Sequence, residues 1–501
     1  MRSLVSTQIS PRAQTAVVVG AVDGLANFDL RGYRSVLWFT RDTASSVARF
    51  DLGGGQMHVE PVDRLDPTRT KASLETLIRS DALHLPSVFV TDEVLQTDAA
   101  PFVPVIDAIF TEFESHQRAR TTRQQDGFTW QSHLLANLPA YARRRVPDAW
   151  QGALHGLPAF ICGAGPSLDA SLPYLKIFAS EGVIFSADSA LKALAHVGVT
   201  PDFAVSVDAR KAPERCLAPG HPSAGRTIVA GISPPDWQHS VAERKLHLLS
   251  GRQLTENALA AIGLRKTTIT VEENCGITAL ALALHLGCGP IYLFGMDHSV
   301  DSKDPSRWHQ SHADPEFERQ LGHSPRSAHP RVPGNYQDEI ATPLFREWRS
   351  LDARCAALAP GLIFNVIDRG ARLSNTTLVA PDQFAPPEHT VAKAPRLEQL
   401  AAPDAFDATT WADARTVLRA LGDRAALSLT EARHLLKSGD YLGAARILAA
   451  TFRDGEFSLL FGNYSLKLMP HLVRPERVEA AAWIPLIAEC EELVELARNL
   501  K

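Results

Sequence analysis

The residues best suited to chemistry follow four short apolar runs that the sequence predicts as strands. The first run, residues 159–162, enters Gly163-Ala164-Gly165-Pro166-Ser167. Glycines let a ligand approach the backbone without a Cβ in the way, proline suits the first position of a helix, and helix N-terminal amides favour an anion. We expect this turn to hold a phosphate or a carboxylate, although a plain strand-to-helix turn has the same composition.

Carboxylates follow the next two predicted strands. Asp188 and Ser189 come after residues 183–186, and Asp208 comes after residues 203–207. The carboxyl ends of neighbouring parallel strands meet in one crevice, where open α/β sheets bind nucleotides. Asp188 and Ser189 are therefore candidates for a ribose or base, and Asp208 for a metal ion, a phosphate-bound water or a proton. Asp188 is equally suited to capping the helix that follows it.

A fourth predicted strand, residues 291–294, is followed by Asp297 and His298. Imidazole titrates near neutral pH, so His298 is a candidate general base. The segment 274–278 leads into a predicted helix over 279–286, and its last residue, Thr278, is a candidate nucleotide contact. Five of the 18 histidines lie close together, at His298, His309, His312, His323 and His329. This spacing fits a polar active-site loop better than a metal site, because no H-x-x-x-H on a clear helix supports zinc.

The elements that must position these residues form an α/β pattern. Near-continuous apolar runs are typical of a mostly parallel sheet covered on both faces. Eight are predicted as strands: 159–162, 183–186, 203–207, 227–230, 246–249, 268–271, 291–294 and 362–366. Between residues 300 and 337 the pattern gives way to a long polar loop, a length typical of lids and binding loops.

The parts on either side of this core have different patterns. Short β-rich runs at 16–19, 35–39 and 87–90 predict a smaller N-terminal α/β domain. Predicted connecting helices cover 104–118 and 129–145, and predicted C-terminal helices cover 404–421, 427–437, 441–452 and 476–500. We therefore expect an N-terminal α/β domain at 1–125, a central Rossmann-like catalytic domain at 126–380, a Pro-rich linker at 381–403 and a helical domain at 404–501.

Composition excludes several classes of protein. The 501 residues carry 51 Lys and Arg against 56 Asp and Glu, a formal charge of −5, which argues against a nucleic-acid partner. Arginines gather between residues 118 and 145, and we favour a solvated helix face over an anionic partner for them. The six cysteines lack C-x-x-C spacing. With no signal-peptide segment or membrane-spanning apolar run, we expect a cytoplasmic protein.

These motifs together resemble the motility-associated-factor (Maf) flagellin glycosyltransferases, which share their core with archaeal 6-hydroxymethylpterin diphosphokinases. The resemblance covers roughly residues 131–376. It is carried by the turn 163–169 and by segments 187–194, 201–208 and 292–297, and residues 332–336 and 365–372 also look like that core.

The resemblance implies a transferase whose central fold is similar to that of bacterial sialyltransferases. Its activity would be transfer of a nonulosonic acid, pseudaminic or legionaminic acid, from a CMP-activated donor to Ser or Thr of flagellin. Residues 163–167 would hold the cytidylate phosphate, and Asp188 and Ser189 would lie near the ribose or base. Asp208 and Asp297 would face the leaving group or a divalent cation such as Mg²⁺.

Two other functions remain open. The same core could transfer diphosphate from ATP to a hydroxymethylpterin, with Asp208 and Asp297 holding Mg²⁺. A non-catalytic nucleotide- or flagellin-binding module is the third interpretation. The carboxylates Asp188, Asp208 and Asp297 beside the glycine turn argue against it, because a pure scaffold has no need to collect them in one crevice.

Overall fold

The chain folds as two compact units. The computed structural model describes residues 13–21, 30–41, 54–64, 67–80, 84–91, 94, 99–220, 224–251, 254–300, 330–387, 392–400, 407–473 and 480–500. One unit comprises Met1–Asp126 and Leu466–Val473, and the other comprises Gly127–Ser465 and Arg474–Lys501. The division falls within α5 (Val103–Arg144).

The first unit contains a four-stranded parallel sheet with the order β3-β2-β1-β4. Its strands are β1 (Thr15–Val19), β2 (Ser35–Thr40), β3 (Gln56–Pro61) and β4 (Ser87–Val90). Helix α3 (Pro67–Ser80) buries Leu74 and Ile78 in a core with Val17 and Phe39. The unit is the small N-terminal α/β part that the short β-rich runs predict.

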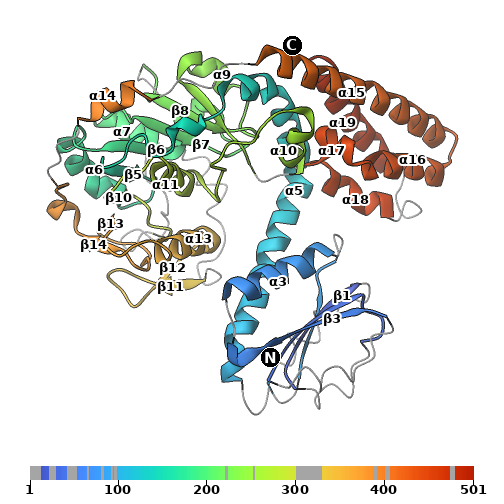
Figure 1. Ribbon diagram of the computed structural model, residues 1–501, viewed down its shortest axis with the longest axis horizontal. Coiled ribbons are helices and arrows are strands. Elements are labelled where there is room, and N and C mark those ends of the chain that lie inside the picture. Colours follow the sequence, from blue (N-terminus) through green and yellow to red (C-terminus); the bar gives the residue numbers. More distant parts are fainter. Residues whose placement is uncertain are drawn as a thin grey trace. The chain divides into compact units, whose positions relative to one another are not determined.

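The second unit contains an eight-stranded sheet in which every strand pair is parallel (Figure 1). In spatial order the strands are β14 (Thr377–Val379), β13 (Ile363–Val366), β10 (Ile291–Phe294), β5 (Ala159–Cys162), β6 (Val183–Ala187), β7 (Phe203–Ser206), β8 (Arg226–Ala230) and β9 (Leu246–Leu249). The chain adds β6 to β9 on one side of β5 and then returns to place β10 on the other side. The strand order therefore reverses at β5 and β10, the position where sheets of this kind bind ligands.

Helices cover this sheet, which explains why its central strands are so apolar. All residues of β5, β6, β7 and β10 are buried. Helices α6 (Leu168–Ile177) and α7 (Leu191–His196) pack their leucines against β5, β6 and β10. Helix α11 (Cys275–His285) contacts β5, β6 and β7. The mixed α/β fold with a large parallel sheet is thus confirmed.

Two predicted elements differ from the structure. Residues 268–271 form no strand, and only Thr270 makes an isolated parallel bridge, with Ser250. The two predicted helices around residues 104–145 are one helix, α5. The residues between them lack an apolar stripe, but Arg, Gln and Ala have high helix propensity and can continue a helix without one.

The C-terminal part is helical, as predicted. Its main helices are α15 (Ala408–Lys437), α16 (Tyr441–Arg453), α18 (Ser465–Val473) and α19 (Ala480–Arg498). Within the second unit, α15 packs against α16 and α19. Gln131 of α5 donates a hydrogen bond to the Leu459 carbonyl and accepts one from the Thr255 hydroxyl. These buried bonds join the C-terminal helices to the sheet domain.

Part of the segment predicted as a linker is packed on the sheet domain. Phe384 is buried and makes edge contacts with Phe160, Phe178 and Phe294. The ammonium of Lys393 lies 2.9 Å from an Asp202 carboxylate oxygen. Phe384 therefore contributes to the core, and Lys393 forms a partly buried ion pair.

Six further α-helices and two further strands complete the described elements of this kind. They are α8 (Pro213–Cys216), α9 (Trp237–Ser240), α10 (Leu254–Ala258), α13 (Phe345–Ala356), α14 (Lys393–Glu398), α17 (Ser458–Phe461), β11 (Arg331–Pro333) and β12 (Glu339–Ala341). Within the described parts of the chain, no helix has the length and apolar character needed to cross a membrane.

Candidate functional site

The glycine turn after β5 lies against the loop that follows β10. The Gly163 and Gly165 amides donate to the Phe294 and Gly295 carbonyls at 2.8 Å. A Cβ on Gly163 would lie 2.5 Å from the Gly295 carbonyl oxygen, and a Cβ on Gly165 only 2.0 Å from a carboxylate oxygen of Asp297. Both positions therefore need glycine because two backbone segments meet there.

Asp297 occupies the N-terminus of α6. One carboxylate oxygen accepts hydrogen bonds from the Ser167 hydroxyl at 2.8 Å and from the Ser167 amide at 3.2 Å. The other oxygen is buried and has no hydrogen-bond partner among the described residues. Burial raises the pKa of Asp297 to about 7, against the lowering effect of the two Ser167 bonds. This carboxyl can therefore hold or release a proton near neutral pH.

Few backbone donors of this turn remain for a ligand. The amides of Gly163, Gly165 and Ser167 bond to groups of the β10 loop, and Pro166 has no N–H. Among the described residues, the Ala164 amide has no partner. The predicted phosphate contact of residues 163–167 remains a prediction, with the Ala164 N–H as its available backbone donor.

His298 is buried beside Asp297 in a left-handed backbone conformation, with φ of 44°. Its Nδ1 lies 3.0 Å from the Met296 carbonyl oxygen. Burial lowers the pKa of His298 to about 4, so the ring is neutral at pH 7. A carbonyl can only accept a hydrogen bond, so Nδ1 carries the proton and Nε2 has the lone pair that a general base needs.

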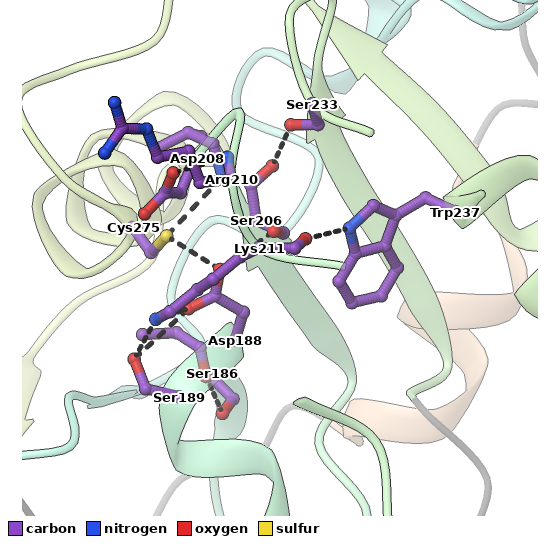
Figure 2. Close-up of polar contacts among 12 residues, drawn as sticks. Ser186, Asp188, Ser189, Ser206, Asp208, Arg210, Lys211, Ser233, Trp237 and Cys275 are labelled. Carbon is purple, nitrogen blue, oxygen red and sulfur yellow. Dashed lines mark hydrogen bonds and ion pairs between the residues drawn. The ribbon is translucent and has the colours of Figure 1, made fainter. Parts of the chain in front are cut away.

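The carboxyl ends of β6 and β7 meet around Asp188, which is fully buried (Figure 2). The ammonium of Lys211 lies 2.9 Å from one carboxylate oxygen, to which the Ser189 hydroxyl also donates at 3.2 Å. The other oxygen accepts from the Ser206 hydroxyl at 2.8 Å and from the Cys275 thiol at 3.3 Å. These four donors fill the carboxylate.

Asp188 and Lys211 stabilise each other in their charged forms. Burial alone would raise the pKa of Asp188, but the charge and hydrogen bonds of Lys211 and Ser206 bring it below its ordinary value. Burial alone would likewise lower the pKa of Lys211, and Asp188 instead raises it. The site therefore holds a fixed ion pair at neutral pH.

Asp208 lies at the end of β7, close to this ion pair (Figure 2). Its carboxylate accepts a 2.8 Å hydrogen bond from the Arg210 amide. Burial raises its pKa, the Arg210 amide lowers it, and the nearby Asp188 charge raises it further. Asp208 is thus a partly exposed carboxyl with an increased affinity for a proton.

The first turn of α11 reaches the same group of residues. Asn274 caps the helix by accepting from the Ile277 amide, and Cys275 contacts Asp188. The Thr278 hydroxyl donates to the Asn274 carbonyl and accepts from the Glu272 amide. Thr278, predicted as a nucleotide contact, is fully buried and uses its hydroxyl to hold the start of α11.

Residues after β13 close the other side of Asp297. Gly370 lies against Asp297, whose carbonyl accepts from the Ala371 amide. The side-chain amide of Asn335 donates to the carbonyls of Gly370 and Ala371. The segments 332–336 and 365–372, quoted above for the family resemblance, are therefore in direct contact beside Asp297.

The predicted metal ligands do not form a coordination group. Asp208 and Asp297 have different hydrogen-bond partners, and in the described parts of the chain no three His, Cys, Asp or Glu side chains could together hold a metal ion. The residues present therefore do not by themselves fit a divalent cation, and we assign no step to one. His309, His312, His323 and His329 lie outside the described residues.

Sequence reasoning missed Lys211 and Cys275. Lys211 lies three residues beyond Asp208, where its sequence context resembles an ordinary polar loop. Cys275 lacks the C-x-x-C spacing of a metal or redox site, so its sequence context gives no sign of a polar role. Their positions in the sequence were the available signal. Lys211 follows soon after the strand that ends before Asp208, and Cys275 lies in the segment that leads into the predicted helix after residues 268–271.

Comparisons with known proteins concern the domain that contains this site and the fold of the chain. Residues 132–303, which contain the glycine turn, Asp188, Asp208 and Asp297, match the family described as 6-hydroxymethylpterin diphosphokinase MptE-like. The chain contains an MptE-like domain. The structure is also similar to that of a Maf glycosyltransferase from Magnetospirillum magneticum AMB-1, with a TM-score of 0.54 and 18% sequence identity, over 97% of this chain and 77% of that chain.

The likeness to the Maf glycosyltransferase concerns the fold, and it extends beyond the MptE-like domain to nearly the whole chain. The search of curated proteins gives no match. The prediction of a Maf-like architecture around an MptE-like core is therefore confirmed at the level of domain and fold.

Proposed function

We propose that the protein is a cytoplasmic glycosyltransferase that moves a nonulosonic acid, pseudaminic or legionaminic acid, from its CMP-activated form to Ser or Thr of flagellin. One observation carries the proposal. Four strand ends bring Ala164, Asp188, Asp208 and Asp297 to the reversal of strand order, in a fold similar to a Maf glycosyltransferase over almost its whole length.

The reaction requires three things of the site. The acceptor hydroxyl oxygen attacks the anomeric carbon of the sugar, the bond from that carbon to the phosphate oxygen breaks, and the electron pair leaves with CMP. The hydroxyl proton passes to a base, for which Asp208 and the Nε2 of His298 are the candidates. Negative charge collects on the departing phosphate, where fixed hydrogen-bond donors and cations stabilise it.

Asp297 would contribute to this reaction through its place at the start of α6. Its carboxylate orders the start of α6 through Ser167, and its second oxygen is buried without a partner among the described residues. A buried carboxyl oxygen in that state is ready to bond a ligand group or a water. With a pKa of about 7, Asp297 can donate or accept in that bond at neutral pH.

A second candidate function is favoured by the family description itself. The MptE-like match names a 6-hydroxymethylpterin diphosphokinase, which would use the same crevice for ATP and a pterin. A non-catalytic binding module is less well supported, because two carboxyls with raised pKa values, Asp208 and Asp297, are the groups expected of proton transfer.

Calorimetric titration of the full chain with CMP and with ATP, each with and without Mg²⁺, separates these functions. We expect CMP to bind and ATP to bind weakly. Incubation with a CMP-nonulosonic acid and flagellin should then increase the flagellin mass by one sugar residue. A preference for ATP would favour the diphosphokinase, and binding of neither nucleotide would refute both enzymes.

A further inference from the structure

Lys211 is a largely buried cation beside the carboxyl ends of β6 and β7. Its side chain is 17% exposed, and its ammonium donates to Asp188 and to the Ser189 hydroxyl, both at 2.9 Å. The Trp237 indole N–H donates to the Lys211 carbonyl at 3.1 Å, which fixes the backbone (Figure 2). The ammonium is therefore held in one place by contacts at both ends of the residue.

Stability alone does not explain this ion pair. Taking two opposite charges out of water costs about as much as their attraction returns, so a buried pair is weak evidence for stabilisation. Asp188 has about four acceptor positions and four protein donors already fill them. The arrangement thus uses Asp188 to hold Lys211 and leaves the carboxylate little capacity for a ligand.

The glycine turn beside it provides little positive potential for an anion. Most of its amides bond to the β10 loop, and the carboxylate of Asp297 already occupies the N-terminus of α6. Ala164 and Asp188 lie at the same level of adjacent strands, because each is two residues beyond the paired Cys162 and Ser186. Lys211 is held by Asp188 at the end of the strand next to β5, and it therefore offers a cation near the turn where a phosphate is expected.

We propose that Lys211 binds the phosphate group of the nucleotide substrate, and that Asp188 and Ser189 position its ammonium for this contact. The proposal deepens the proposed function and rests on it in one respect, namely that the ligand is a nucleotide. Lys211 would then stabilise the negative charge that develops on the departing phosphate, and Asp188 would act as a positioning residue.

The test compares two largely buried lysine–aspartate pairs in the same unit, whose lysine side chains are similarly exposed. Lys393 also lies 2.9 Å from an aspartate, Asp202, but at the amino ends of β6 and β7. We would measure the affinity of Lys211→Met and Lys393→Met for CMP, cytidine and ATP by calorimetry. The double variant D188N/K211M removes both charges, so that no uncompensated carboxylate remains.

We expect K211M and D188N/K211M to bind CMP at least tenfold more weakly than the wild type, with cytidine affinity nearly unchanged. K393M should bind both ligands as the wild type does, whatever its loss of thermal stability. Wild-type affinity for CMP in D188N/K211M would overturn the proposal, since Lys211 would then serve only to neutralise Asp188.

The two proposals fail in different ways. If the wild type prefers ATP and K211M weakens ATP binding, the role of Lys211 stands and the glycosyltransferase is refuted. If CMP binds and the double variant binds it equally well, the glycosyltransferase stands and the role of Lys211 is refuted. If neither nucleotide binds the wild type, both are refuted.

Discussion

The contact between Gly165 and Asp297 leads to a quantitative prediction for the substitution Gly165→Ala. The added Cβ would lie 2.0 Å from the carboxylate oxygen that accepts both Ser167 bonds, and 2.7 Å from the Gly295 carbonyl. Real Cβ atoms stay at least 3.0 Å from such oxygens, so the carboxylate must move by about 1 Å or more. The 2.8 Å bond from the Ser167 hydroxyl would then exceed hydrogen-bond distance.

The energetic effect follows from the bonds that are lost. Hydrogen bonds to a charged group contribute about 1.5 to 3 kcal/mol each, so loss of both Ser167 bonds predicts a destabilisation of about 3 kcal/mol or more. Urea unfolding followed by tryptophan fluorescence measures this change, and CMP titration should show weakened binding in the same variant.

A glycine with open surroundings provides the matched control. A Cβ on Gly455 would meet no atom within 4 Å, so Gly455→Ala should change the unfolding free energy by less than about 0.5 kcal/mol. If Gly165→Ala were as stable as this control, the contact between the turn and Asp297 would not exist as described.

Further predictions concern four other residues. Asp208→Asn should abolish sugar transfer in a product assay while the circular dichroism spectrum stays unchanged, and normal turnover would remove Asp208 from the mechanism. His298→Ala should slow turnover without loss of CMP affinity, whereas a parallel loss of both would indicate a structural role. Phe384→Ala should lower the unfolding free energy by about 3 to 5 kcal/mol in urea, and a loss below about 1 kcal/mol would contradict its packing. Burial and two nearby arginine charges lower the pKa of His247 from 6.5 to about 3. The unfolded chain therefore binds this proton more readily than the folded protein, and the unfolding free energy falls by roughly 5 kcal/mol as the pH drops from 6.5 toward 3. His247→Phe should flatten this acid dependence of unfolding, and an unchanged pH profile would count against it.

Strands of the larger sheet whose residues are all buried, whether central or at its edge, could be predicted from sequence because burial on both faces gives continuous apolar runs. Residues 159–162, 246–249 and 291–294 coincide with β5, β9 and β10. Strand β3 (Gln56–Pro61) was missed because it lies at a sheet edge, where most of its side chains are at least partly exposed. Its apolar signal is correspondingly weak.

The sequence predicts at which strand ends the site residues lie, but it does not predict which residues form hydrogen bonds with them. Strand ends correctly place Asp188 and Asp208 near each other, because parallel topology brings them to one edge. The contact of Ser167 with Asp297 spans 130 residues, and its geometry depends on β10 returning beside β5. Sequence spacing contains no information about which donor fills which acceptor across such a distance.

The return of β10 also determines when the site can form during synthesis. Strands β6 to β9 leave the ribosome soon after β5 and can pair in chain order, whereas β10 follows all of them. Until Ile291 and its neighbours arrive, β5 is an open edge with unpaired backbone groups on a fully apolar strand. A nascent or truncated chain that stops before β10 therefore exposes an unpaired apolar strand edge at the future ligand site, where pairing with another chain would lead to aggregation.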